Sequence, residues 1–365
     1  MSASPDVTVI GLGVMGSAAV YHLARRGLRV LGLEQFSPAH DRGSSHGRTR
    51  VIRQAYFEHP DYVPLVLRAY ELWRELEAET KRTLLVKTGG LMIGPSDGPV
   101  FRGSLESARR HSIPHRLLSR DELARTHPFM KFRPRDEALW EEDAGVLFAE
   151  ECVLAFQERA RELGAELRFG AKAALPASGK TVITAGSWLP ELAPDVPLQI
   201  ERQVMLWFDL PADHPRTPLF IWDYGTVPFY SIPDVRGDGV KVAFHHHGEI
   251  TTPERIRRDV GPDEIEAMRA RLRETVPVLS ERFRRTVTCL YSNTPDEHFA
   301  VGFAAGRKDT VIASPCSGHG FKFGSVIGEI VADLVVDGRT RHPIEPFGLE
   351  RFRRGSNPGS ARNVS

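Results

Sequence analysis

The feature that most constrains the fold is a glycine-rich turn near the start of the chain. Residues 7–10 (Val-Thr-Val-Ile) are typical of a buried parallel strand, and helical spacing follows over residues 17–26. Between them, Gly11, Gly13 and Gly16 form a Gly-x-Gly-x-x-Gly pattern. The first glycine permits a tight turn, the second lets the backbone approach a pyrophosphate, and the third lets the helix pack closely on the strand. The N–H groups and dipole at the helix start favour an anion.

An acidic residue after the next strand supports the same interpretation. Residues 28–33 predict a second strand, and Glu34 stands at its end, 21 residues after Gly13. A carboxylate there can accept hydrogen bonds from ribose hydroxyls and repels a 2′-phosphate, which disfavours NADP. We therefore predict a dinucleotide site, with a chance glycine turn as the alternative. The pattern alone does not separate NAD from FAD, although its N-terminal position favours FAD.

The rest of the chain predicts a discontinuous α/β protein. Strand–turn–helix patterns recur over residues 181–188 and 311–336, and residues 253–276 predict a charged helix. Four stretches have β-type patterns typical of an antiparallel sheet: 199–209, 217–222, 227–232 and 239–247. We expect a Rossmann-type cofactor domain that is interrupted by an inserted, sheet-rich α+β substrate domain. The predicted boundaries are 1–85, 145–200 and 286–345 for the cofactor domain, 86–144 and 201–285 for the substrate domain, and 351–365 for a flexible tail.

Charge and cysteine content exclude several classes of protein. The net charge of +1 argues against nucleic acid or an anionic membrane as partner. Cys152, Cys289 and Cys316 are an odd number of cysteines without Cys-x-x-Cys spacing, which indicates a reducing compartment and no disulfide framework. No secretory signal precedes the first strand and no apolar run is long enough to span a membrane. We expect a cytoplasmic protein.

Three further segments carry more specific patterns. They are Gly-Ser-Ser-His-Gly-Arg-Thr-Arg-Val-Ile-Arg at 43–53, Thr-Cys-Leu-Tyr at 288–291 followed by Thr-Pro-Asp-Glu-His-Phe at 294–299, and Ser-Gly-His-Gly-Phe-Lys-Phe at 317–323. With them, residues 6–345 resemble the monomeric sarcosine oxidase family, which includes N-methyltryptophan oxidase and pipecolate oxidase. The resemblance implies a monomeric FAD-dependent oxidase that converts the C–N bond of a secondary (N-methyl or N-alkyl) amino acid to an imine and reduces O2 to H2O2.

The resemblance also implies a covalent bond between a cysteine sulfur and the 8α-carbon of the flavin, and the matching position is Cys289. A thiolate is a good nucleophile, and the neighbouring Arg284 and Arg285 could favour that form. The alternative is a small buried apolar side chain. Cys316 competes by its position beside a glycine turn but does not match the attachment site, and Cys152 falls in a predicted helix and reads as core.

Several cations match functional positions of the family. Arg53 and Lys322 match the clamp for the substrate carboxylate, since Arg can bind it with two hydrogen bonds and Lys adds a point charge. Arg50 is implied to lie over the flavin ring and to stabilise its anionic reduced form. Lys241 matches the lysine that activates dioxygen, and strand alternation should turn it away from the face of Val240 and Val242. A solvated surface position is the alternative for Arg53, Lys322 and Lys241.

His245 matches a histidine that contacts substrate, and Tyr230 and Tyr291 match aromatic residues that line the pocket, with plain core as the alternative. The expected contacts to the cofactor, besides those already named, are Ser44, His46, Thr49, Gly318, Gly320 and Phe321. A metal site at residues 245–247 (His-His-His) is not expected, because adjacent strand residues point to opposite faces. We assign no metal, and no role to Glu297 or His298.

One departure from the family and two other functions stay open. Residues 169–176 look compressed relative to the family, so no site residues are assigned there. A flavin dehydrogenase with an acceptor other than oxygen is one alternative, against which Lys241 argues. An NAD-type or non-enzymatic Rossmann protein is the other.

Overall fold

The computed structural model describes residues 4–173, 175, 179–225 and 227–352. The chain forms two compact units: residues 1–39, 156–199 and 292–365 make the first, and residues 40–155 and 200–291 the second. Residues 40–85, which we assigned to the cofactor domain, pack within the second unit. The predicted domains are defined by function and these units by packing, so the domain boundaries stay a prediction.

The first unit is built on a six-stranded sheet in the order β16-β17-β10-β1-β2-β9. Its strands are β1 Val7–Ile10, β2 Val30–Glu34, β9 Glu166–Phe169, β10 Lys180–Ile183, β16 Ala300–Ala304 and β17 Arg307–Ser314. All neighbours pair in parallel except β16, which pairs antiparallel with β17. The sheet is therefore of the Rossmann type, with β1 among its inner strands.

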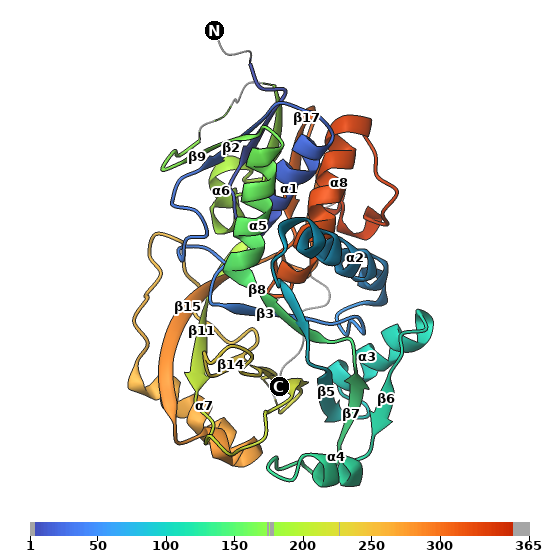
Figure 1. The fold of residues 1–365 in the computed structure, drawn as a ribbon, viewed down its shortest axis with the longest axis vertical. Coiled ribbons are helices and arrows are strands. Elements are labelled where there is room, and N and C mark those ends of the chain that lie inside the picture. Colours follow the sequence, from blue (N-terminus) through green and yellow to red (C-terminus); the bar gives the residue numbers. More distant parts are fainter. Residues whose placement is uncertain (1–3, 174, 176–178, 226, 353–365) are drawn as a thin grey trace. The chain divides into compact units, whose positions relative to one another are not determined.

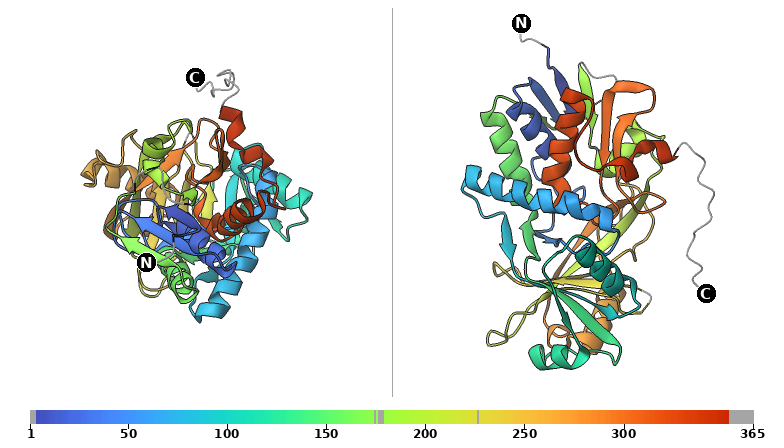
Figure 2. Two further views of the ribbon diagram at one scale, coloured as in Figure 1. Left: turned by 90° about the horizontal axis from the view of Figure 1, so that it is seen from above. Right: turned by 90° about the vertical axis from the view of Figure 1, so that its right-hand side faces the viewer.

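Helices α1 (Val14–Arg25) and α8 (Gly324–Asp337) lie side by side in the first unit (Figure 1 and Figure 2). Their close approach requires a glycine, because a Cβ atom on Gly328 would lie 2.6 Å from backbone and side-chain carbons of Ala18. The same unit holds α6 (Leu189–Leu192). Helix α5 (Ala149–Glu162) begins in the second unit and ends in the first.

The second unit holds an eight-stranded sheet in the order β15-β11-β14-β13-β12-β5-β7-β6. Its strands are β5 Gly90–Pro95, β6 Arg116–Leu118, β7 Asp136–Glu141, β11 Gln199–Phe208, β12 Leu219–Trp222, β13 Phe229–Ile232, β14 Val240–Phe244 and β15 Phe283–Asn293. The pairings described are antiparallel except that of β12 with β5. A smaller sheet has the order β3-β8-β4, with β3 Thr49–Ile52, β4 Leu85–Lys87 and β8 Gly145–Phe148.

Apolar side chains on one face of the large sheet form the main core of the second unit. Phe208, Phe220, Trp222 and Phe229 are fully buried there, and Leu272 of α7 (Pro262–Thr275) packs against them. The remaining helices of this unit are α2 (Val63–Thr80), α3 (Pro99–Arg110) and α4 (Arg120–Thr126). No helix in the described part of the chain is long and apolar enough to cross a membrane.

The mixed α/β fold is confirmed, and three local predictions are corrected. The helix predicted over 253–276 begins only at Pro262, whose fixed φ suits a first helical position after extended Gly261. The strand predicted over 239–247 ends at Phe244. In the predicted tail, Arg351 belongs to a 3-10 helix (Leu349–Phe352) and donates to Asp296, while residues 353–365 lie outside the described part.

The compressed segment at 169–176 is described only in part. Phe169 ends β9, an edge strand that pairs with β2, and the chain continues through residues 170–173 and 175. Residues 174 and 176–178 lie outside the described part. The trimmed hairpin therefore stays a prediction.

Candidate active site

The glycine turn of the first unit has the geometry of a dinucleotide cradle. Gly11 has φ of +89°, which only glycine adopts without strain, and a Cβ atom on Gly16 would lie 1.8 Å from the carbonyl oxygen of Gly11. Gly13 caps α1 without a side chain, and the first turn of α1 carries no acidic group. The N–H groups at the helix start can therefore donate hydrogen bonds to a pyrophosphate, so the residues present fit the ADP part of a dinucleotide.

Glu34 has a structural task beside its predicted one. Its two carboxylate oxygens accept the backbone N–H groups of Leu12 (2.8 Å) and Phe36 (3.0 Å), so it ties the end of β2 to the glycine turn. A carboxylate has about four acceptor sites, which leaves capacity for a ribose hydroxyl. Contact of Glu34 with ribose stays a prediction.

Cys289, in the middle of β15, is a buried cysteine with an activated thiol. Burial raises its pKa, but a hydrogen bond from His46 and the charge of Arg50 outweigh this effect and lower the pKa to about 7. The Nη2 atom of Arg50 lies 3.6 Å from the sulfur and also donates to the carbonyl oxygen of Ser44 at 2.7 Å. This pKa favours formation of the thiolate near neutral pH.

The predicted source of this activation was wrong. Arg284 is directed to Asp209 (3.2 Å) and to the carbonyl oxygen of Gly237, while Arg285 stacks over Trp207 with 3.9 Å from the guanidinium carbon to the ring centre. Alternation along β15 turns Arg284 to the face opposite Cys289, whereas Arg285 shares the face of Cys289 but lies four residues, about 13 Å, along the strand. The groups that lower the pKa of Cys289 are His46, from the loop before β3, and Arg50, from β3 itself.

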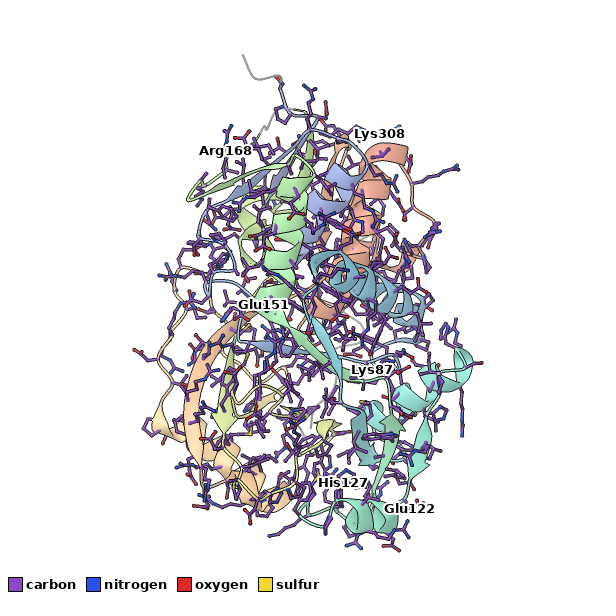
Figure 3. The ribbon with its side chains drawn as sticks, in the orientation of Figure 1. Lys87, Glu122, His127, Glu151, Arg168 and Lys308 are labelled. Carbon is purple, nitrogen blue, oxygen red and sulfur yellow. The ribbon has the colours of Figure 1, made fainter. Side chains whose placement is uncertain are left out.

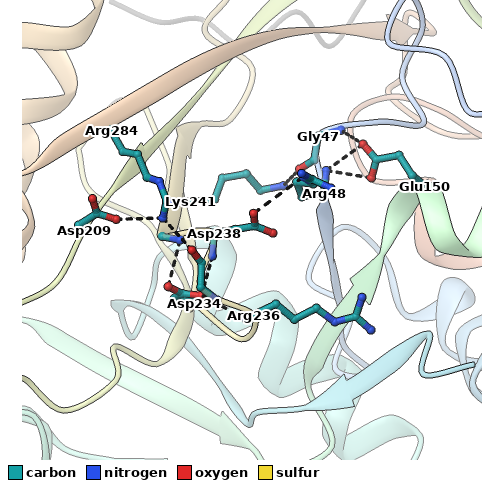
Figure 4. A network of polar contacts seen from close by, with 11 residues as sticks. Gly47, Arg48, Glu150, Asp209, Asp234, Arg236, Asp238, Lys241 and Arg284 are labelled. Atoms are coloured by element: carbon teal, nitrogen blue, oxygen red, sulfur yellow. Dashed lines mark hydrogen bonds and ion pairs between the residues drawn. The ribbon is translucent and has the colours of Figure 1, made fainter. Parts of the chain in front are cut away.

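Lys241 is fully buried, so the solvated-surface alternative is wrong for it. It faces away from the core that holds Val240 and Val242, as alternation along β14 predicts. Its ammonium group donates to the carbonyl oxygen of Gly47 at 3.1 Å, in the network of Figure 4, and to that of Thr49. Burial lowers the pKa of Lys241 well below its usual value, and neighbouring Arg50 lowers it further.

Two tyrosines and two histidines form a polar aromatic group beside Cys289. Nδ1 of His245 lies 3.3 Å from the hydroxyl oxygen of Tyr291, and the ring of His246 packs 4.2 Å from His245 and 5.3 Å from Tyr291 between centres. Burial raises the pKa of Tyr230 to about 12, against the effect of Arg50. These phenols therefore stay protonated and can donate hydrogen bonds.

The argument from strand alternation against a metal site at residues 245–247 was wrong. They follow the end of β14, and His246 has φ of +53°, so strand alternation does not apply to them. In the described residues, no three histidine, cysteine, aspartate or glutamate side chains are grouped so that they could hold a metal ion.

Arg53 is also fully buried, directly after β3. Its Nη2 lies 2.6 Å from the carboxylate of Glu58, its Nη1 donates to the carbonyl oxygen of Ala55 (3.0 Å), and it stacks on the rings of Tyr56 and Phe57. Its Nε has no hydrogen-bond partner in the described structure. A buried guanidinium with a spare N–H can accept a further anionic group.

Lys322 and the turn before it lie in the first unit. Lys322 is 5% exposed and donates to the carbonyl oxygen of His319 at 2.7 Å. Gly318 has φ of +76°, and a Cβ atom on Gly320 would lie 1.5 Å from the carbonyl oxygen of Pro315. The 317–322 turn thus requires its glycines, and Phe321 begins the 3-10 helix Phe321–Phe323 that follows.

The Thr-Pro-Asp-Glu-His-Phe segment, to which we gave no role, holds this turn. Thr294 contacts the side-chain oxygen of Ser317 through its N–H and its hydroxyl (3.3 Å each), and Nε2 of His319 lies 3.1 Å from the carbonyl oxygen of Glu297. Asp296 in turn accepts hydrogen bonds from Thr294 and from the N–H of His298. The segment is therefore a structural support for the turn that carries Lys322.

Two carboxylates, buried Glu141 and partly buried Glu150, were missed by sequence reasoning. Glu141, at the end of β7, accepts the N–H groups of Gln54 (2.6 Å) and Ala55 (2.8 Å), directly after Arg53. Burial raises the pKa of Glu141 to about 7, although both N–H groups and Arg53 act in the opposite direction. Glu150, in the first turn of α5, accepts the N–H groups of Gly47 and Arg48. For both residues, the only signal in the sequence was an acidic residue beside a predominantly apolar strand.

The predicted site residues fall into two groups. Gly11, Gly13, Gly16, Glu34, Gly318, Gly320, Phe321 and Lys322 belong to the first unit. The second unit contains Ser44, His46, Thr49, Arg50, Arg53, Tyr230, Lys241, His245, Cys289 and Tyr291. Ser44 donates through its hydroxyl to the carbonyl oxygen of Leu290, next to Cys289.

Known proteins resemble this chain over nearly its whole length. Residues 6–334 match the DAO family of FAD dependent oxidoreductases. The monomeric sarcosine oxidase of Streptomyces avermitilis is 44% identical, with 96% of this chain and 99% of that protein covered. The N-methyl-L-tryptophan oxidase of Salmonella newport is 31% identical over 95% of this chain and 99% of that protein.

Solved structures share the fold at low sequence identity. The amino acid oxidase NikD, essential for nikkomycin biosynthesis, has a TM-score of 0.82 at 23% identity over 95% of this chain and 98% of that one. L-proline dehydrogenase from P. horikoshii has a TM-score of 0.83 at 23% identity over 97% and 99%. The match to the DAO family decides for FAD and against NAD, a choice that the glycine turn alone left open. The chain belongs to the family of FAD-dependent oxidoreductases.

Proposed function

We propose that the protein is an oxidase of secondary amino acids. The substrate loses two electrons and two protons as its C–N bond becomes an imine, and O2 takes them up as H2O2. When bound, FAD supplies the electron transfer between the two. The observation that carries the proposal is the buried group of Arg50, Lys241 and Cys289, in a chain that is 44% identical to a sarcosine oxidase.

We also propose that Cys289 bonds to the flavin through its sulfur. The supporting observation is its pKa of about 7, which makes the nucleophilic thiolate abundant at neutral pH. Cys316 competes by position but does not match the attachment site of the family, and its sulfur accepts from the hydroxyl of Ser314 at 3.8 Å. Cys152 is fully buried and its pKa is raised well above the usual value, so it fits a core role.

Arg53 and Lys322 are the proposed clamp for the substrate carboxylate. The spare Nε–H of buried Arg53 supports this role, since a carboxylate could join the pair that Arg53 forms with Glu58. Lys322 offers a second buried cation on a rigid turn. The hydrogen-bonded pair of His245 and Tyr291 would contact the rest of the substrate.

Lys241 and Arg50 would stabilise negative charge as electrons reach O2. Both cations are fixed by backbone carbonyl oxygens, so little reorganisation is needed when charge develops. A monomeric state, the proposed division into cofactor and substrate domains, and a cytoplasmic location are further parts of this proposal. The word monomeric in the names of the sarcosine oxidases supports the first of them.

A visible spectrum of the purified protein, followed by peroxide release, tests the proposal. We expect a yellow protein whose acid-precipitated pellet stays yellow, and peroxide from sarcosine, other N-methyl amino acids, proline or pipecolate. A colourless pellet with free flavin in the supernatant would refute the Cys289 bond alone. Absence of peroxide across the panel would refute the oxidase, and substrate bleaching with slow reoxidation in air would establish a dehydrogenase instead.

A further inference from the structure

Glu150 is a partly buried acidic residue outside the group of side chains that the proposed function uses. Its carboxylate accepts the backbone N–H of Gly47 at 2.8 Å and that of Arg48 at 3.0 and 3.1 Å (Figure 4). Burial raises the pKa of Glu150, but these N–H groups and Arg50 outweigh burial and lower it. Glu150 is therefore an anion at neutral pH.

The opposite side of the same backbone segment holds Lys241. The carbonyl oxygens of Gly47 and Thr49 accept from its ammonium group. The carbonyl of Gly47 and the N–H of Arg48 are the two ends of one planar peptide group. That single peptide group thus links the ammonium of Lys241 to the carboxylate of Glu150. Opposite charges at its ends polarise it and strengthen both hydrogen bonds.

The segment depends on such support, because its backbone conformation is strained. Gly47 has φ of +91° and Arg48 has φ of +69°, and the second value is unfavourable for a residue with a side chain. The N–H of Ala149, next to Glu150, also donates to the carbonyl oxygen of Arg48 at 2.9 Å. The first residues of α5 therefore bind both the N–H groups and the Arg48 carbonyl group of this turn.

The charges that act on Lys241 give Glu150 a particular weight. Burial lowers the pKa of Lys241, as do Arg50 and Arg285, while Cys289 and Glu150 raise it. A sulfur that is bonded to flavin carries no charge. In the enzyme as proposed, Glu150 is then the anion among these groups that still raises the pKa of Lys241.

We infer that Glu150 is a positioning residue for Lys241: through the Gly47–Arg48 peptide group it fixes the ammonium in place and favours its charged form. The consequence for oxygen reactivity rests on the proposed function, whereas the consequence for the lysine itself does not. Loss of the carboxylate charge should leave Lys241 neutral over a wider pH range. Reaction with O2 should then be slower at neutral pH.

The first test measures Lys241 directly in the holoenzyme. The chain contains only eight lysines, so NMR of protein with 13C-labelled lysine can follow Lys241 through a pH titration, with its signal assigned from Lys241→Met. The variant is Glu150→Gln, which keeps the shape of the side chain. The matched control is Glu151→Gln at the next residue, which is labelled in Figure 3. The side chain of Glu151 is 46% exposed and pairs only loosely with Arg82 at 3.5 Å.

We expect Lys241 to titrate at lower pH in Glu150→Gln than in the wild type, and Glu151→Gln to match the wild type. Equal titration in all three proteins would overturn the inference. Glu150→Asp keeps the charge and covers the case that Glu150→Gln does not fold. In Glu150→Asp, Lys241 should titrate at higher pH than in Glu150→Gln. If Glu150→Gln does not fold, Glu150→Ala replaces it as the variant without a carboxylate. Lys241 in Glu150→Asp should then titrate between its values in Glu150→Ala and in the wild type.

The second test is stopped-flow reoxidation of the substrate-reduced enzyme. We expect Glu150→Gln to react with O2 about tenfold more slowly at pH 7, with an unchanged rate of reduction by substrate, because a hydrogen bond to a charged group is lost. An unchanged rate beside a shifted lysine titration would refute the link to oxygen. A wild-type protein without oxidase activity would refute the proposed function, while the NMR titration would still decide the role of Glu150.

Discussion

Glu141 should make the stability of this protein depend on pH in an unusual direction. Its carboxyl group is fully buried at the end of β7 and holds the N–H groups of Gln54 and Ala55. Its pKa is about 7 in the folded protein, against an ordinary value of 4.5. Between these values the folded state binds a proton that the unfolded state releases. Stability that Glu141 contributes is therefore present at low pH and is lost as pH rises through 7.

The size of the effect follows from the two pKa values. A difference of about 2.5 pKa units corresponds to about 3 kcal/mol in the free energy of unfolding once both states are ionised. Part of this change falls below pH 5, so about 2–3 kcal/mol is expected between pH 5 and pH 8. No reduction for solvent screening is needed, because the side chain is inaccessible to water.

Urea unfolding of the wild type and Glu141→Gln at pH 5 and pH 8 measures this effect. The amide can accept only one of the two N–H groups, so at pH 5 the variant should be less stable by about 1–3 kcal/mol. At pH 8 the difference should vanish or reverse, because the variant has no charge to bury. Glu142→Gln, a change at the adjacent exposed residue, is the control. The same pH dependence in Glu141→Gln as in the wild type would show that the reasoning is wrong.

Three more outcomes are expected from the site. Covalent flavin attachment to apoprotein should be half-maximal near pH 7 and absent in Cys289→Ser, as measured from colour in the acid-precipitated pellet; attachment in Cys289→Ser would contradict the assignment. In Gly16→Ala the added Cβ would lie 1.8 Å from the carbonyl oxygen of Gly11, whereas 3.0 Å is the closest tolerated approach, so the backbone must shift by at least about 1.2 Å. The flavin that the variant retains on gel filtration should therefore drop sharply. Arg53→Lys should raise KM for a secondary amino acid roughly 10- to 100-fold in a peroxide assay, and an unchanged KM would remove Arg53 from the clamp.

The cradle could be predicted from sequence because its parts are local. Gly16 and Glu34 act on backbone within about 25 residues of one another, and each residue type has a narrow physical reason to be there. The position of Cys289 could also be located, because it lies within a specific run of residues. Both depended on short stretches of chain.

The environment of the thiol could not be predicted in the same way. Arg50 and Cys289 are 239 residues apart, and nothing in either segment shows that they meet. Reasoning from neighbours in sequence selected Arg284 and Arg285, which are directed elsewhere. The roles of Glu141 and Glu150 could not be predicted for the same reason. The role of Glu150 becomes visible only when the structure places it beside the turn whose N–H groups it binds.

The position of β1 within its sheet has a consequence for how the protein is made. This strand is synthesised long before its neighbour β10, which begins at Lys180, and before β17, which begins at Arg307. Helix α1 likewise packs against α8, which ends at Asp337. A nascent chain on the ribosome therefore carries an incomplete cradle until residue 337 has emerged, and loading of the cofactor is expected only after that point in translation.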